Sequence, residues 1–269
     1  MKRFYALSLS LALAASLLAG CGSSGGASSG SSGSSASGSG SAAASSSSSG
    51  TETPDPAQVR QGYQNALNAL MVDHVFPDGT EADVTFVENN DFSDNQFAVC
   101  DIDGDGVEEL ILCYTNASMA GNLLGIYQYD PATDSYHTEL SEFPSATFYD
   151  NGYVKVDWSH NQGMAGDFWP YSLYQYDAAA DEYVMVKSVD AWQKSLFPKG
   201  LDGTAFPDDV DTSHSGFVYY LYDGTAEGAA DPVDKSALDQ LVKDTYGSAQ
   251  EVNVDYQPLT AENVQAVTA

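Results

Sequence analysis

The pattern of hydrophobic and polar residues changes twice along the chain. From Pro56 to about His74, apolar residues recur every three or four positions, which is typical of an amphipathic helix. From about Phe86 to Tyr222, short runs of Tyr, Val, Phe and Leu are divided by Asp, Asn, Gly and Pro, which predicts antiparallel strands. The sequence therefore predicts a β-rich α+β fold in which an antiparallel meander follows an N-terminal helix.

Helical periodicity returns near the C-terminal end. Asp231 and Pro232 predict the start of a helix, and Gly247 lies just past its predicted end. A shorter helix is predicted from Asp190 to Leu196. The predicted meander is thus flanked by an N-terminal helix and by C-terminal helices.

The predicted meander contains an internal duplication. Residues between Asn116 and Gly121 recur 45 positions later, between Asn161 and Gly166. Residues between Tyr127 and Tyr136 recur 47 positions later, between Tyr174 and Tyr183, and a fainter third copy follows at Tyr220 to Asp223. Each unit has the length of a propeller blade, but two units and a fragment are too few to close a propeller. We expect an antiparallel sheet built from two to three repeats of about 47 residues.

Composition divides the chain into three segments. Residues 1–20 begin with Lys2 and Arg3 and continue as an apolar run that is too short for a permanent membrane span, which predicts a secretion signal. Residues 21–52 consist almost entirely of Ser, Gly and Ala and predict a flexible tether. Residues 53–269 have the length of a single folded extracellular domain.

The end of the apolar run carries a processing motif. Leu18, Ala19 and Gly20 directly precede Cys21, and this segment resembles the lipobox of bacterial envelope lipoproteins. The resemblance implies that Cys21 is lipidated and that the mature protein is anchored to the cell membrane on its extracytoplasmic face. The alternative is an ordinary secreted protein in which Cys21 is incidental.

Charge restricts the partners of the mature protein. Removing Lys2 and Arg3 from the 9 basic residues leaves 7 against 38 acidic residues, a net charge of −31. So negative a chain repels phosphate polymers, which excludes nucleic acid as a partner. Cys100 and Cys113 flank an acidic loop at a separation that does not suit a disulfide, so we predict free, buried thiols.

The segment from Asp101 to Leu110 carries the clearest chemical motif. Its aspartates alternate with other residues, and Gly104 and Gly106 permit the tight turn that would bring the carboxylates together. Oxygen ligands without His or thiolate favour calcium over zinc. Glu108 is expected to point to solvent. The predicted ligands are the carboxylates of Asp101, Asp103, Asp105 and Glu109 and the carbonyl of Val107.

This motif is not an EF-hand, because Leu112 occupies the twelfth position and the residues that follow predict a strand. It resembles the D-x-D-x-D-G loops of FG-GAP and VCBS repeats, which implies the ligand roles given above. The duplication places Ala146 opposite Asp101 and Phe148 opposite Asp103, so we expect one structural calcium ion and no second copy of the loop site. The alternative is an acidic turn that binds no metal.

Aromatic residues recur in pairs within the repeats and suggest a ligand surface. Tyr pairs at alternate positions share one face of a strand, and exposed rings would suit a carbohydrate or a peptide. The alternative is half-buried packing. The candidate ligand-binding residues are Tyr127, Tyr129, Trp158, His160, Trp169, Tyr174 and Tyr176.

These patterns favour a membrane-anchored, calcium-stabilised binding module over an enzyme. The alternative is an extracellular hydrolase that acts on glycans or peptides. Outside the tether, the sequence contains neither a G-x-S-x-G nor an H-E-x-x-H motif. Ser159 and His160 are adjacent, and on a strand they would point to opposite faces, so we do not expect them to form a catalytic pair.

Overall fold

The computed structural model describes residues 54–161, 163–200, 202–224 and 230–269, and the statements below concern these residues. They belong to one compact unit, Gly50–Ala269. The predicted signal segment 1–20, the lipidation site Cys21 and the predicted tether 21–52 lie outside the described residues.

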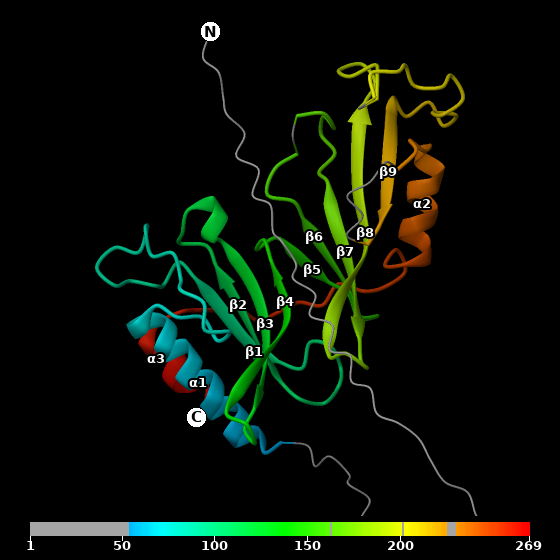
Figure 1. Ribbon diagram of the computed structural model, residues 1–269. Coiled ribbons are helices and arrows are strands. Elements are labelled where there is room, and N and C mark those ends of the chain that lie inside the picture. Colours follow the sequence, from blue (N-terminus) through cyan, green and yellow to red (C-terminus); the bar gives the residue numbers. More distant parts are fainter. Residues whose placement is uncertain (1–53, 162, 201, 225–229) are drawn as a thin grey trace, which may run out of the picture. The chain divides into compact units, whose positions relative to one another are not determined.

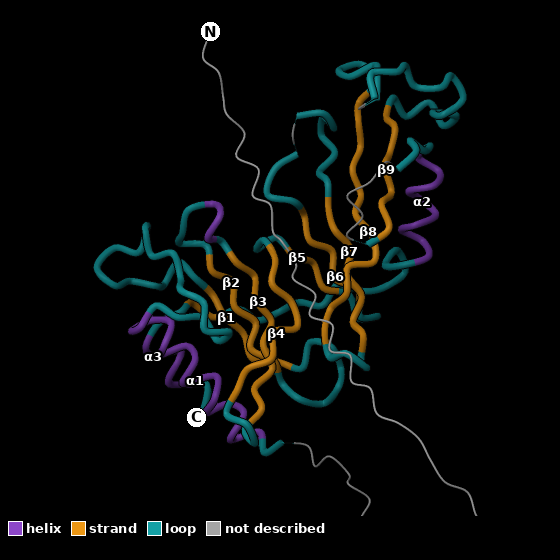
Figure 2. Tube along the Cα trace, in the orientation of Figure 1, coloured by secondary structure: helices purple, strands orange, loops and turns teal. Residues whose placement is uncertain are grey.

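The described chain forms two antiparallel five-stranded sheets and few helices, which confirms the predicted β-rich fold (Figures 1 and 2). The first sheet has the strand order β10-β1-β2-β3-β4, and the second has the order β5-β6-β7-β8-β9. The strands of the first sheet are β1 (Gln96–Cys100), β2 (Glu109–Tyr114), β3 (Leu123–Asp130), β4 (Ser135–Glu142) and β10 (Gln257–Pro258). Those of the second sheet are β5 (Ala146–Phe148), β6 (Tyr153–Asp157), β7 (Tyr171–Asp177), β8 (Glu182–Gln193) and β9 (Phe217–Asp223).

Helix α1 (Pro56–Asp73) begins where the sequence predicted. The Asp55 side chain accepts a hydrogen bond from the backbone N–H of Ala57 at 3.0 Å, and Pro56 occupies the first turn. The apolar side of α1 is buried against β2 and β3 in one hydrophobic cluster, and the short helix α3 (Ala261–Ala266) lies beside α1 (Figure 1). This packing holds α1 close to the loop between β1 and β2.

Helix α2 (Lys235–Asp244) begins later than predicted and packs against β9 (Figure 1). The expected start at Asp231 and Pro232 is wrong because Val233 is extended and exchanges two backbone hydrogen bonds with Tyr219 of β9, at 2.8 and 3.0 Å. Asp234 is the N-cap instead, and its carboxylate accepts a hydrogen bond from the backbone N–H of Ser236.

The predicted helix from Asp190 to Leu196 is also wrong. Strand β8 continues through Gln193, and its residues from Lys187 onward pair with β9. Trp192 is buried in a cluster with Tyr220. Pairing with β9 therefore determined the conformation here, although the apolar residues have helical spacing. A local sequence pattern does not reveal such pairing.

The β3–β4 and β7–β8 hairpins share several local features at the predicted spacing of 47 residues. The pairing register of the first hairpin shifts between Ile126 and Tyr127, and that of the second shifts between Leu173 and Tyr174. The turn residues Asp134 and Asp181 both have a left-handed backbone, with φ of 53° and 57°. These matches support the duplication, which as a whole stays a prediction.

The two sheets contribute to a common hydrophobic cluster. Ile111 and Ile126 come from the first sheet, while Val154, Val156 and Tyr174 come from the second. A hydrogen bond also connects the two sheets: the His137 ring on β4 is 2.6 Å from the carbonyl oxygen of Asp181 in the β7–β8 turn. The β7–β8 turn of the second sheet therefore contacts β4 of the first.

Candidate metal centre

The predicted calcium loop connects two adjacent antiparallel strands. Cys100 ends β1 and Glu109 begins β2, and these two residues are partners in the ladder. Gly104 and Gly106 have φ of 83° and 95°, so both occupy the left-handed region that the tight turn requires. The loop thus folds back on itself directly above the start of β2.

Each loop aspartate uses one carboxylate oxygen to hold the backbone. Oδ1 of Asp101 accepts a hydrogen bond from the N–H of Gly104 at 2.8 Å, and Oδ1 of Asp103 accepts one from Asp105 at 2.9 Å. Oδ1 of Asp105 accepts a hydrogen bond from the N–H of Val107 at 2.6 Å. The second oxygens of Asp101 and Asp103 are left for another partner, which is the arrangement that a cation-binding loop needs.

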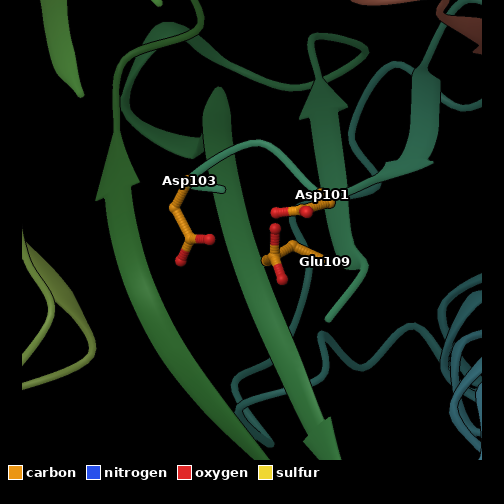
Figure 3. Close-up of side chains that lie close together, drawn as sticks. All are labelled: Asp101, Asp103 and Glu109. Atoms are coloured by element: carbon orange, nitrogen blue, oxygen red, sulfur yellow. The ribbon is translucent and has the colours of Figure 1, made fainter. Parts of the chain in front are cut away.

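Three carboxylates converge inside the loop. One oxygen from each of Asp101, Asp103 and Glu109 lies within 4.8 Å of the other two, and the three side chains turn toward a common space (Figure 3). Calcium binds oxygens at 2.3–2.6 Å, so ligand oxygens on opposite sides of the ion are about 5 Å apart. Separations of at most 4.8 Å therefore allow one calcium ion to contact all three oxygens.

Burial leaves two oxygens of this group without a partner. Glu109 is completely buried, and its Oε2 accepts a hydrogen bond from the N–H of Ile102 at 2.9 Å. Its Oε1, and Oδ2 of Asp103, are buried and accept no hydrogen bond from any described residue. An unpaired buried carboxylate is costly, so a partner for these oxygens would stabilise the folded state.

Sequence reasoning missed two further acidic residues. One oxygen from each of Asp103, Glu139 and Asp181 also lies within 4.8 Å of the other two. Glu139 belongs to β4 and is 3% exposed, and neither of its oxygens has a hydrogen-bond partner among the described residues. One signal was present in the sequence: Val186 stands 47 positions after Glu139, so the second unit has an apolar residue where the first has a carboxylate.

The electrostatics of the two groups are those of crowded, desolvated carboxylates. Burial raises the pKa of Glu109 to about 9, and the neighbouring Glu139 and Asp103 carboxylates contribute to the rise. Burial also raises the pKa of Glu139 to about 9, with Asp103 and Asp181 as the main charged neighbours. Burial raises the pKa of Asp103 as well. A bound cation would offset the cost of burying these negative charges.

The other predicted loop residues lie around this centre. Asp105 is exposed and belongs to neither group of three, and its Oδ2 accepts a 3.4 Å hydrogen bond from Gln128. Val107 is half-buried at the end of the turn. The expectation that Glu108 points to solvent is wrong, because Arg60 of α1 donates two hydrogen bonds to its carboxylate, at 2.6 and 2.7 Å. The salt bridge attaches the loop to α1.

The predicted tyrosine platform is not exposed. Tyr127 and Tyr129 are buried under α1, and Tyr174 is buried between the sheets. Tyr176 is half-buried, and its hydroxyl donates a 2.7 Å hydrogen bond to the carboxylate of Asp181. These rings fill the space between the first sheet and α1 and the space between the two sheets. Packing was the alternative interpretation of the tyrosine pairs.

The remaining ligand candidates lie together after β6. Trp169 is 45% exposed, and its indole N–H donates a 2.6 Å hydrogen bond to the carbonyl of Trp158. Oγ of Ser159 and Nδ1 of His160 are 3.0 Å apart. The expectation that these two side chains diverge is wrong because both residues follow the end of β6 and lie in a loop. No carboxylate in the described part of the chain bonds to the His160 ring.

The cysteines are free, as predicted, but they are half-buried and not buried. Cys100 and Cys113 are free, and they lie at opposite ends of the β1–β2 ladder, where Cys100 pairs with Glu109 and Cys113 with Gln96. Burial raises the pKa of the Cys100 thiol to about 11.

No described helix combines the length and the hydropathy that a membrane span requires. Comparison with protein-family models, with curated proteins and with solved structures found no match to this chain. The chemistry of the site itself therefore carries the functional argument.

Proposed function

We propose that the chain is an extracytoplasmic lipoprotein, anchored through Cys21, whose folded domain is a calcium-stabilised binding module. The observation that carries this proposal is a pair of buried oxygens, Asp103 Oδ2 and Glu109 Oε1, that accept no hydrogen bond within the described segments. Both residues belong to a group of carboxylates whose oxygens lie within 4.8 Å of one another. A divalent cation would supply the partner that these oxygens lack.

The ligand chemistry favours calcium. All ligands of the loop are oxygens, and calcium accepts six to eight of them in flexible geometry, whereas magnesium demands a near-ideal octahedron at shorter distances. The role of the ion is structural, because its ligands lie at the start of β2 beneath a loop that α1 also holds. Binding to the folded state stabilises it by about 2.7 kcal/mol when free calcium is at a hundredfold excess over Kd.

Calorimetry on the full-length chain, purified in mild detergent and stripped of divalent ions, tests the calcium site. We expect binding of CaCl2 at millimolar Kd or tighter and a rise of a few degrees in the melting temperature. Asp101→Asn should lose most of the affinity of the loop. Asp150→Asn is the matched control, since Asp150 occupies the β5–β6 turn and accepts a hydrogen bond from the N–H of Gln250. Wild-type protein that binds no calcium at millimolar concentration would contradict the proposal.

We further propose that the loop after β6 contacts a carbohydrate or a peptide. Trp169 is large and 45% exposed, and its hydrogen bond to Trp158 fixes the ring. A fixed, exposed indole can stack on a sugar ring or on an apolar side chain at low entropic cost. A glycan and peptide array, probed with and without calcium, should give a signal that Trp169→Ala removes. Phe86→Ala, at a 56% exposed aromatic residue elsewhere, should keep it.

The Ser159–His160 hydrogen bond is the one feature that favours the alternative, an extracellular hydrolase. Both side chains lie near the surface, and within the described residues no acidic side chain orients the histidine. A nucleophile normally needs a base that a third group holds in place. The binding module is therefore the better-supported function.

A further inference from the structure

Asp103 belongs to both groups of carboxylates described above. The first group contains Asp101 and Glu109 from the β1–β2 hairpin, and the second contains Glu139 and Asp181, which are distant in sequence. The first group comes from a single loop of the first sheet, whereas the second also includes a turn of the second sheet. The second group is therefore a product of tertiary packing and has no local motif.

Glu139 owes its buried position to a β-bulge. Ile126 pairs with Leu140 and Tyr127 pairs with Thr138, so Glu139 is the extra residue of β4. A bulge redirects one side chain, and here it buries a carboxylate whose two oxygens both lack a partner among the described residues. The matching bulge of the β7–β8 hairpin contains Val186, which shows that the bulge itself does not need a carboxylate. A bound ligand would therefore give the buried carboxylate of Glu139 the partner that it lacks.

Asp181 reaches the same place from the other sheet. Its carboxylate accepts a 2.7 Å hydrogen bond from Tyr176, and Asp134 accepts an equivalent bond of 2.6 Å from Tyr129. The two aspartates thus have the same local geometry, but among the described residues only Asp181 belongs to a group of three such carboxylates. The hydrogen bond between the His137 ring and the carbonyl of Asp181 holds this turn against β4.

We infer that Asp103, Glu139 and Asp181 form a second position for a divalent cation, adjacent to the loop position and sharing Asp103 with it. This inference rests on the proposed calcium site of the loop, and it replaces the single ion expected from the sequence with two. The two groups together contain five carboxylates, so two divalent ions could each be held by three of them, with Asp103 shared between the two positions. The ligand set is again all oxygen, which favours calcium.

The two ions would stabilise different parts of the fold. An ion bound by the β1–β2 loop stabilises one hairpin. An ion bound by Glu139 and Asp181 connects β4 of the first sheet to the β7–β8 turn of the second. The number of ions that bind per chain is therefore the quantity to measure.

Equilibrium dialysis of full-length protein in detergent against calcium counts the ions. We expect two calcium ions per wild-type chain and one per chain in Asp181→Asn and in Glu139→Gln. Asp134→Asn is the matched control and should bind two. Circular dichroism spectra identify a variant that fails to fold, and the two single variants on different sheets serve as independent tests.

The outcomes separate this inference from the proposed function. A wild-type stoichiometry of one ion that Asp101→Asn removes, and that Asp181→Asn and Glu139→Gln keep, overturns the second position and leaves the loop site intact. A single ion that Asp181→Asn or Glu139→Gln removes overturns the inference of two positions and the loop site as proposed. A stoichiometry of two that neither Asp181→Asn nor Glu139→Gln reduces also overturns it. Wild-type protein that binds no calcium overturns both proposals.

Discussion

Glu139 is a charged residue at a buried position of a β-strand, where an apolar residue would be expected. A strand of the first sheet buries a carboxylate at a bulge, whereas the equivalent bulge of the second sheet contains Val186. Without a cation, burial of an unpartnered charged group destabilises the folded state. With a cation, the same group contributes a ligand.

This conflict predicts that one substitution has opposite effects in the two conditions. Glu139→Gln should raise the free energy of unfolding of the calcium-free protein by about 1–3 kcal/mol, because glutamine avoids the cost of burying or protonating the carboxylate. The same variant should gain less stability than wild type when calcium is added. Urea unfolding in EGTA and in calcium measures both changes. Glu88→Gln, at an exposed position, should change neither, and a calcium-free Glu139→Gln protein that is less stable than wild type would contradict the explanation.

The loop residues were predictable from the sequence because they are local. The alternation of Asp101, Asp103 and Asp105 with glycines sets the backbone that the structure has. Glu139 and Asp181 were not predictable, because they meet the loop only after the two sheets pack together. The expectation that Glu108 points to solvent failed for the same reason, because its partner Arg60 is 48 residues away in the sequence.

At the level of elements, strand and hairpin patterns were more reliable than helix ends. The antiparallel strands and α1 follow the predicted periodicity, because alternation and capping act over a few residues. The predicted helix at Asp190 to Leu196 failed because β9 supplies a neighbouring strand, and α2 starts late because Val233 pairs with Tyr219. Both errors arise where a distant segment pairs with the backbone.

The β1–β2 hairpin should loosen from the loop end when calcium is removed. Cys100 adjoins the loop, and Cys113 lies at the other end of the ladder, so the two thiols report on different ends of one element. We expect EGTA to accelerate the reaction of Cys100 with a thiol reagent more than that of Cys113. The variants Cys113→Ser and Cys100→Ser allow each thiol to be followed alone. Equal acceleration at both thiols would indicate that the whole hairpin opens at once.

At the level of the whole molecule, the proposed anchor makes a separate prediction. Cys21→Ala should remove the acylated residue, so the protein should leave the membrane fraction or stay unprocessed. Detergent phase partitioning and the mass of the mature N-terminus measure this. Cys100→Ala, at a thiol within β1, should leave partitioning unchanged. A Cys21→Ala protein that partitions and is processed like wild type would refute the anchor.

The unpartnered carboxylates beneath the β1–β2 loop also affect when the chain folds. Calcium sites of extracellular modules have Kd values of roughly 10⁻⁴ to 10⁻³ M, so such a site stays empty wherever free calcium is scarce. If the predicted signal directs export, the chain must cross the membrane before its domain becomes rigid. Repulsion among the empty ligands would keep the newly made domain loose inside the cell. Calcium outside the cell would then complete folding after translocation. The folded, calcium-bound domain could not return through the export machinery, so translocation would proceed in one direction.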